Sequence, residues 1–279
     1  MIEVNNLESE DLKPYTITSE VQLKRYFEPD KLGIFIAESP KVIRLALDDG
    51  YEPLSVLAER KYIDGQAKDI IERCGDIPVY TADSYVLTRI TGFKLTQGIL
   101  CAMRRRENPS VDEILKHSSR IAVLEDVMNQ TNVGAVMRSA AAMNIDAVLL
   151  TPACSDPLYR RSVRVSMGTV FRMPWTYFDD NVNYIELLKE YGFSTVAMAL
   201  HDNTLDIDSP VLKSLDQISV ILGTEGEGLK QSTIESCDYT VKIPMAEGVD
   251  SLNVAAASAI AFWELRKITE KLSQCLFIY

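Results

Sequence analysis

The chain has 279 residues, of which 47% are hydrophobic and 25% charged, and it carries a formal net charge of −11. This length exceeds that of a typical single domain, so we expect two domains with separate cores. No apolar run approaches the roughly 18 residues that a membrane helix needs. The acidic amino end lacks the basic and apolar zones of a signal peptide, so we expect a cytoplasmic protein without a membrane partner.

The cysteines and histidines exclude several kinds of site. Five cysteines lie far apart and form no CxxC pair, which argues against a disulfide framework and against a zinc cage. The two histidines, His117 and His201, are too few for a His-rich metal site, and neither is near a GxSxG elbow. We therefore expect no metal and no serine-hydrolase triad.

The negative net charge counts against a nucleic-acid partner, because proteins that neutralise phosphates usually carry an excess of Lys and Arg. Local charge, however, acts within a Debye length of roughly 8 to 10 Å. Two basic clusters are present, one at residues 104–106 and one formed by Arg160, Arg161 and Arg164. They allow a basic face on an acidic protein.

The first part of the chain alternates short apolar runs with segments of helical periodicity, which predicts a small α/β domain. Before residue 20 there is no strong pattern. We expect a domain over residues 1–103, with 1–19 as an extension, and a linker over 104–118, where charge, a proline and a short helix interrupt the alternation. The predicted elements are GIFIAE, KVIRLALDDG, PLSVLAE, GQAKDIIERCG, IPVYTA, SYVLTRITG and QGILCAM, within residues 33–103.

The alternation restarts in the second part, residues 119–279, and predicts a parallel α/β sheet. A strand at RIAVLED is followed by a helix at NVGAVMRSAAAMN and a strand at DAVLLT. Further strands are expected at MPWTYF, STVAMAL, ISVILG and YTVKI. A closing amphipathic helix is expected from Asn253 to Leu272.

Ligands bind open α/β sheets at the carboxyl ends of the strands, and three turns of the second part are candidates there. In the first turn, LEDVMNQTNVGAVMR, Asn132 can cap a helix and Arg138 lies on its first turns; alone, this is an ordinary capped helix. The second, LGTEGEGL at 222–229, has glycines that can expose backbone N–H groups. It fits neither a phosphate loop nor GxGxxG, so an ordinary Rossmann site is disfavoured, and a plain turn is the alternative.

The third turn is IPMAEGVDSLNVAAASAIAFWEL, in which a strand ends at Pro244 and an alanine-rich helix begins near Ser251 and Asn253. Taken singly, the alanines indicate a core or subunit contact, and Ser251 indicates a helix N-cap.

Together and in this order, the three patterns resemble the SpoU (TrmH) family of SPOUT methyltransferases over residues 120–272, including the intermediate segment RRSVRVSMGTVFRMP. The sequence departs from the usual pattern at Gln130, Gly248 and Ala255. The segments IFIAESPKVIRLALDDGYEPLSVL and TQGILCAMRR are similar to the L30e-like substrate-binding domain that often precedes the catalytic domain.

This resemblance implies a fold, a cofactor and a site. The fold is an α/β parallel-sheet domain with a carboxyl-terminal trefoil knot, preceded by the L30e-like domain, and the protein acts as a homodimer. An apolar helix with Phe262 and Trp263 suits the contact across its two-fold axis. The residues that match the S-adenosylmethionine site are Leu200, Leu222, Gly223, Glu225, Gly228, Ile243, Met245, Ser251 and Leu252.

The resemblance also implies catalytic roles for Arg138, Asn132, Glu225, Ser251 and Asn253. Arg138 matches the family's catalytic arginine. Because a guanidinium stays protonated in proteins, we expect it to clamp a phosphate and stabilise a developing alkoxide, not to act as a base. Asn132 would position the nucleotide or Arg138, and the other three would orient the arginine and the cofactor.

The expected activity is methylation of a ribose 2′-hydroxyl in a structured RNA, with RNA and not DNA as the partner. Ribosomal RNA is preferred because the L30e-like domain accompanies many rRNA-directed members. Three alternatives stay open: methylation of tRNA, methylation of a base, and a catalytically silent RNA-binding protein.

Overall fold

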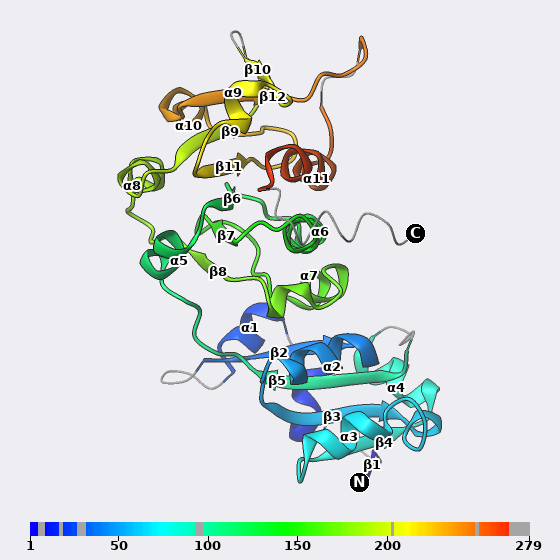
Figure 1. Cartoon of the computed structure of the whole chain (residues 1–279). Coiled ribbons are helices and arrows are strands. Elements are labelled where there is room, and N and C mark those ends of the chain that lie inside the picture. The colour runs from blue at the N-terminus through cyan, green and yellow to red at the C-terminus, as the bar shows by residue number, and fades with distance from the viewer. Residues whose placement is uncertain are drawn as a thin grey trace. The chain divides into compact units, whose positions relative to one another are not determined.

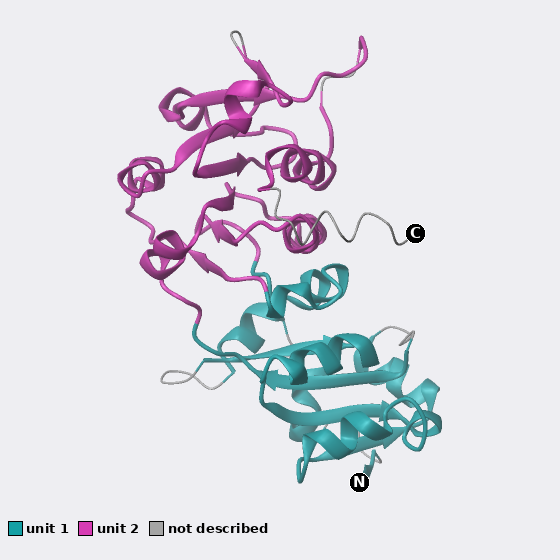
Figure 2. Ribbon diagram, viewed as in Figure 1, with its two compact units in different colours: residues 1–107, 156–172 teal, residues 108–155, 173–279 magenta. Residues whose placement is uncertain are grey.

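The computed structural model describes residues 1–4, 9–16, 19–26, 32–92, 97–201, 204–248 and 251–267. The chain divides into two compact units (Figure 2). Unit 1 comprises residues 1–107 and 156–172, and unit 2 comprises residues 108–155 and 173–279. Both units are α/β, as predicted. The assignment of the first domain as L30e-like, with the boundaries 1–103, 104–118 and 119–279, stays a prediction.

Unit 1 is built on a five-stranded mixed sheet (Figure 1). β5 pairs antiparallel with both β2 and β3, whereas β3, β4 and β1 run parallel. In spatial order the strands are β1 (Ile2–Glu3), β4 (Val79–Ala82), β3 (Pro53–Glu59), β5 (Ile99–Arg104) and β2 (Ile34–Glu38). The helices are α1 (Glu20–Lys24), α2 (Pro40–Asp48), α3 (Lys68–Cys74), α4 (Ser84–Thr91) and α7 (Arg160–Val165), with 3₁₀ turns η1 (Glu10–Tyr15), η2 (Arg60–Tyr62) and η3 (Thr169–Phe171).

The amino-terminal residues contribute to the core of unit 1, although the sequence shows no pattern there. Leu12 and Tyr15 of η1 are both only 1% exposed. The Tyr15 hydroxyl lies 2.7 Å from Ser55 Oγ and accepts a hydrogen bond from Ala102 N–H. Part of the predicted extension is therefore integral to this unit.

Residues 156–172, which follow a strand of the second sheet in sequence, pack with unit 1. Asp156 is almost fully buried, and Arg105 Nη1 donates to both of its carboxylate oxygens at 3.0 and 3.1 Å. A buried charge is tolerated only when it is paired in this way. The pair holds the start of this segment beside β5 and β2.

Unit 2 is built on a seven-stranded sheet in which every recorded pair is parallel. The central strands β6 and β11 are entirely buried, which explains why they appear in the sequence as continuous apolar runs. In spatial order the strands are β10 (Leu205–Asp206), β12 (Tyr239–Lys242), β9 (Ser194–Met198), β11 (Ile218–Leu222), β6 (Arg120–Leu124), β7 (Ala147–Leu150) and β8 (Trp175–Tyr177).

Helices cover both faces of this sheet (Figure 1). Buried side chains of α5 and α8 join the core on one face, and α6 packs against α11 on the other. The helices are α5 (Val111–His117), α6 (Gln130–Ala142), α8 (Tyr184–Glu190), α9 (Pro210–Lys213), α10 (Gln231–Ser236) and α11 (Val254–Leu265). The trefoil knot stays a prediction.

The closing helix differs from the expectation. α11 begins after Asn253 and ends at Leu265, where Arg266 turns to extended backbone, and residues 268–272 of the predicted helix lie outside the described residues. It is not amphipathic, because alanine and large apolar residues occupy most of its circumference. Phe262 is fully buried, whereas Trp263 is 45% exposed, so Phe262 fills this unit's own core and the predicted intersubunit role is wrong for it. In the part of the chain that the structure describes, every helix is too short or too polar to span a bilayer.

Candidate functional site

The glycine-rich turn at residues 223–229 follows β11 and folds back closely on itself. Gly228 N–H donates to Thr224 O at 3.1 Å. A Cβ on Gly223 would lie 2.3 Å from the Gly228 carbonyl carbon, so this position accepts only glycine. Gly226 and Gly228 adopt φ of +92° and +72°, the left-handed region that glycine enters without strain. The glycines therefore let backbone pack on backbone.

A cavity of about 470 Å³ lies beside this turn. All nine residues predicted from the sequence to hold the cofactor line it: Leu200, Leu222, Gly223, Glu225, Gly228, Ile243, Met245, Ser251 and Leu252. Three distant segments thus converge on one pocket, although the cofactor role of each residue stays a prediction. Sequence reasoning missed lining residues that neighbour these, including Met198, Ala199, Glu227 and Ala257.

Three polar side chains meet at the edge of this pocket. Asn132 of α6 and Asn253, which precedes α11, both donate through Nδ2 to Glu225 Oε1. Asn253 Nδ2 also lies 3.3 Å from Asn132 Oδ1. We call Asn132, Glu225 and Asn253 the amide–carboxylate cluster. It joins the glycine-rich turn to the starts of two helices, and all three members were predicted as site residues.

Neither of the two helices is capped by the residue that the sequence favoured. Asn253 caps α11 by accepting from Ala255 N–H at 2.9 Å, so the prediction of Ser251 as this N-cap is wrong. Asn132 does not cap α6; Asn129 does, by accepting from Thr131 N–H at 2.9 Å. Asn132 lies within the first turn of that helix and is 4% exposed. Its amide is thereby free to reach Glu225.

The predicted catalytic arginine is not part of the cluster within this chain. Arg138 is exposed, and the structure records no hydrogen bond or ion pair between it and any described residue. It lies six positions after Asn132, about 120° away around the helix axis, so the two side chains leave α6 on different faces. Ser251 lines the pocket and is exposed, and likewise no hydrogen bond joins it to another described residue.

The lining suits a ligand with apolar and polar parts. Leucine, isoleucine and methionine side chains can flank an aromatic base, and the backbone of the glycine-rich turn offers N–H and C=O groups to polar edges. Across the described ranges of the chain, no group of three or more His, Cys, Asp or Glu side chains could hold a metal ion. The mixed apolar and polar lining of the pocket suits an organic ligand.

Comparison with known proteins identifies the family. The model of the SpoU rRNA Methylase family matches residues 119–263, more than half of the chain. The chain belongs to the SpoU rRNA methylase family. Consistent with this, it is 37% identical over 237 residues to an uncharacterized tRNA/rRNA methyltransferase of Mycobacterium bovis, covering 85% of this chain and 82% of that one.

This SpoU protein is also similar to a curated relative and, in its fold, to a solved structure. The 23S rRNA (guanosine-2′-O-)-methyltransferase RlmB of Vibrio vulnificus is 32% identical over 173 residues, 60% of this chain and 69% of its own. The crystal structure of an AdoMet-bound rRNA methyltransferase from Sinorhizobium meliloti superposes with a TM-score of 0.76 at 24% identity, covering 94% of this chain and 96% of that one. The parallel-sheet α/β fold predicted from the sequence is confirmed.

Proposed function

We propose that this SpoU protein methylates the 2′-hydroxyl of a ribose in a structured RNA, with S-adenosylmethionine as the methyl donor. The observation that carries the proposal is the convergence of nine separately predicted residues on one pocket, with the amide–carboxylate cluster at its edge. The 2′-O specificity named for the Vibrio relative supports the same reaction here. Ribosomal RNA is the preferred substrate, with tRNA as the second candidate.

The lining of the pocket suits the donor in its chemistry, because apolar side chains alternate with polar groups and glycine backbone. Gly223 and Gly228 lie so close that any side chain on Gly223 would displace the backbone that shapes the cavity wall. When bound, S-adenosylmethionine would supply a sulfonium-borne methyl group for transfer to the ribose oxygen, with S-adenosylhomocysteine as the product. Glu225, Ser251 and Leu252 would hold the donor so that the methyl faces the incoming oxygen.

The chain's own polar groups then act on the RNA. Arg138 would clamp a phosphate of the target nucleotide and stabilise charge that develops on the ribose oxygen, because a guanidinium remains protonated and presents a fork of donors. The cluster Asn132, Glu225 and Asn253 would orient the nucleotide and the donor. The first domain, proposed as L30e-like, would bind the RNA, and the enzyme would act in the cytoplasm as a homodimer.

The reaction is tested by supplying the pure protein with methyl-labelled S-adenosylmethionine and RNA from a strain that lacks the gene. After nuclease digestion, we expect the label on ribose, at a position that is unmethylated in the deletion strain. Label on a base would replace this proposal with base methylation. Donor binding without transfer to any RNA would favour a silent RNA-binding protein.

The role of Arg138 is tested by Arg138→Ala. We expect donor affinity to stay within several-fold of the wild type, because Arg138 does not line the pocket, while methyl transfer falls by orders of magnitude. A fully active variant would remove Arg138 from the mechanism.

A further inference from the structure

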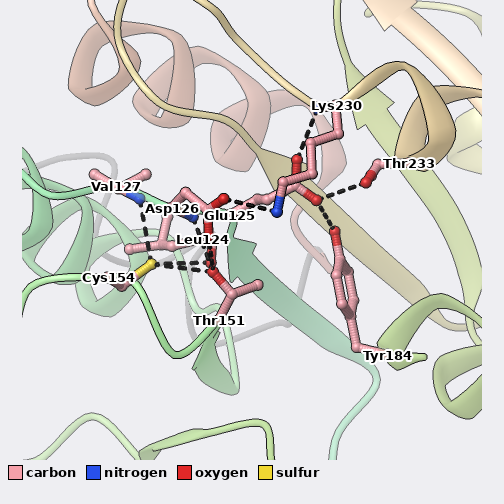
Figure 3. Close-up of polar contacts among 9 residues, drawn as sticks. All are labelled: Leu124, Glu125, Asp126, Val127, Thr151, Cys154, Tyr184, Lys230 and Thr233. Atoms are coloured by element: carbon pink, nitrogen blue, oxygen red, sulfur yellow. Dashed lines mark hydrogen bonds and ion pairs between the residues drawn. The ribbon is translucent and has the colours of Figure 1, made fainter. Parts of the chain in front are cut away.

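A buried carboxylate that the sequence analysis did not single out lies at the carboxyl end of β6. Glu125 is 2% exposed, and its two oxygens accept three hydrogen bonds (Figure 3). Oε1 accepts from the backbone N–H of Lys230 at 2.8 Å. Oε2 accepts from Thr233 Oγ1 at 2.6 Å and from the Tyr184 hydroxyl. A buried acidic group persists in a fold only when it is satisfied in this manner.

Glu125 ties together both ends of the glycine-rich turn. Its backbone N–H donates to Leu222 O at 2.8 Å, just before the turn, and its carboxylate accepts from Lys230 N–H, just after it. The seven residues between, 223–229, include Glu225 and the glycines of the pocket wall. One residue, directly after the neighbouring strand β6, thus fixes the distance that this turn must span.

The next residue, Asp126, fixes the same turn after β6. Asp126 has φ of +55°, unusual for a residue other than glycine. Its N–H donates to Thr151 Oγ1 at 2.9 Å, and its carboxylate accepts from that hydroxyl at 2.8 Å and pairs with Lys230 Nζ at 2.8 Å (Figure 3). Lys230 is therefore held through its backbone by Glu125 and through its side chain by Asp126.

The chain that follows Glu125 and Asp126 leads into α6, the helix that carries Asn132. Cys154 Sγ accepts from Val127 N–H at 3.3 Å and donates to Leu124 O at 3.2 Å, so the residues on both sides of Glu125 and Asp126 are fixed to the turn that follows β7. From there the chain enters α6, where Asn132 donates to Glu225. The glycine-rich turn, which carries Glu225, and the start of α6, which carries Asn132, are therefore both held by residues directly after β6.

The contacts of Glu125 suit a positioning role and not direct chemistry. Glu125 does not line the pocket, and its oxygens are occupied by neutral donors of other elements. Burial and the adjoining Glu125 carboxylate raise the pKa of Tyr184 far above its ordinary value, so the Tyr184 hydroxyl stays a donor at neutral pH.

We propose that Glu125 is a positioning residue that presets the glycine-rich turn for the methyl donor, with Tyr184 and Thr233 holding its carboxylate in place. The proposal rests on the proposed function, because it concerns the same pocket. If the turn is preset, weakening this anchor must lower donor affinity more than it lowers turnover at saturating donor.

The test uses the two hydroxyls, because Glu125→Ala would leave three interior donors without an acceptor and can prevent folding. Tyr184→Phe and Thr233→Val remove one donor each and keep the volume. Calorimetry with S-adenosylmethionine and with S-adenosylhomocysteine should show a rise in Kd of about three- to tenfold for each variant, and more for the double variant. Turnover at saturating donor should stay within about twofold of the wild type. Thr233→Ser keeps the hydroxyl that Thr233→Val removes and should bind the donor with wild-type affinity.

Tyr191→Phe is the matched control. The Tyr191 hydroxyl also donates to a carboxylate, that of Asp112, from the residue that follows α8, but this contact is exposed and does not involve the pocket. We expect Tyr191→Phe to leave Kd unchanged. Wild-type affinity in the double variant, whatever its melting temperature, would overturn the proposal for Glu125. A wild-type protein that takes up neither donor nor product would instead overturn the proposed function.

Discussion

At the scale of single residues, the amide–carboxylate cluster depends on two amide donors that share one carboxylate acceptor. Glu225 supplies acceptor oxygen only, whereas Asn132 and Asn253 direct their Nδ2 donors at it. Both asparagines could be replaced by aspartate almost without a change of shape. The chemistry of the amide, and not its size, therefore maintains the contact between α6, the glycine-rich turn and α11.

Asn132→Asp tests this division of roles. The substitution places a second carboxylate against Glu225, and like charges at hydrogen-bond distance repel each other. We expect methyl transfer at pH 8 to fall by about ten- to a hundredfold, and Glu225→Gln in the same chain to recover much of the loss by restoring a donor between the two. Asn129→Asp, one turn earlier, is the control, because aspartate caps a helix as well as asparagine does. A double variant no better than Asn132→Asp would contradict the assignment.

The ion pair between Asp126 and Lys230 predicts a pH dependence of stability. Burial by itself would raise the pKa of Asp126, but the hydrogen bonds from Lys230 and Thr151 together lower it below its ordinary value. A lowered folded-state pKa means that the contribution is present above the unfolded pKa of about 3.9 and is lost as pH falls through the folded value.

Asp126→Asn isolates this charge, because asparagine also tolerates the left-handed backbone at this position. We expect urea unfolding at pH 7 to show a loss of about 0.2–1 kcal/mol, the usual range for a partly exposed pair. The difference between the two proteins should shrink toward zero below about pH 4. A difference that is unchanged at pH 3 would mean that the charge of Asp126 is not its source.

At the scale of elements, the sequence predicted what is local and missed what is distant. The apolar run ISVIL identifies β11, and LGTEGEGL identifies the turn after it, because both patterns lie within a few residues. The burial of Tyr15 depends on Ser55 and Ala102, and no periodicity near residue 15 reports those partners. Glu125 was missed for the same reason. A charged residue at the end of an apolar strand indicates the start of a loop, and its partners in α8 and at α10 lie far away in the sequence.

The glycine-rich turn carries a prediction about close packing. Gly223→Ala introduces a methyl carbon 2.3 Å from the Gly228 carbonyl carbon, far inside van der Waals contact, so the turn must open. We expect a loss of about 1–3 kcal/mol in the free energy of unfolding together with weaker binding of S-adenosylmethionine. Gly65→Ala is the control, because its Cβ would meet only Tyr62 O at 3.8 Å. Equal melting temperatures for the two variants would show that the turn is looser than its geometry indicates.

At the scale of the whole molecule, the site lacks one predicted member within a single chain. The pocket and the amide–carboxylate cluster lie in unit 2, but Arg138 projects from another face of α6 and is exposed. Ile260 and Trp263 of α11, the helix that packs against α6, are also unusually exposed for their size. Large apolar side chains of this kind are enriched at subunit contacts. In the proposed homodimer, a second copy of the chain would cover them and would bring its own arginine.

Mixed dimers test whether Arg138 acts across subunits. Chains with Arg138→Ala and chains with Glu225→Ala are each expected to be almost inactive as homodimers. Co-expressed with different affinity tags and purified through both, they form a dimer in which one pocket keeps Glu225 and faces an intact Arg138 from the other chain. Because a two-fold dimer has two sites, and one of them is then complete, we expect about half of the wild-type methyl transfer.

The same experiment distinguishes this arrangement from one in which each chain uses its own arginine. In that case every site of the mixed dimer lacks either Arg138 or Glu225, so no activity returns. Light scattering on the wild-type protein supplies the second condition, because a monomer mass in solution would leave no partner to provide the arginine. Recovery of activity in a protein of dimer mass would therefore explain why Arg138 has no partner among the described residues of its own chain, and why α11 keeps Trp263 at the surface.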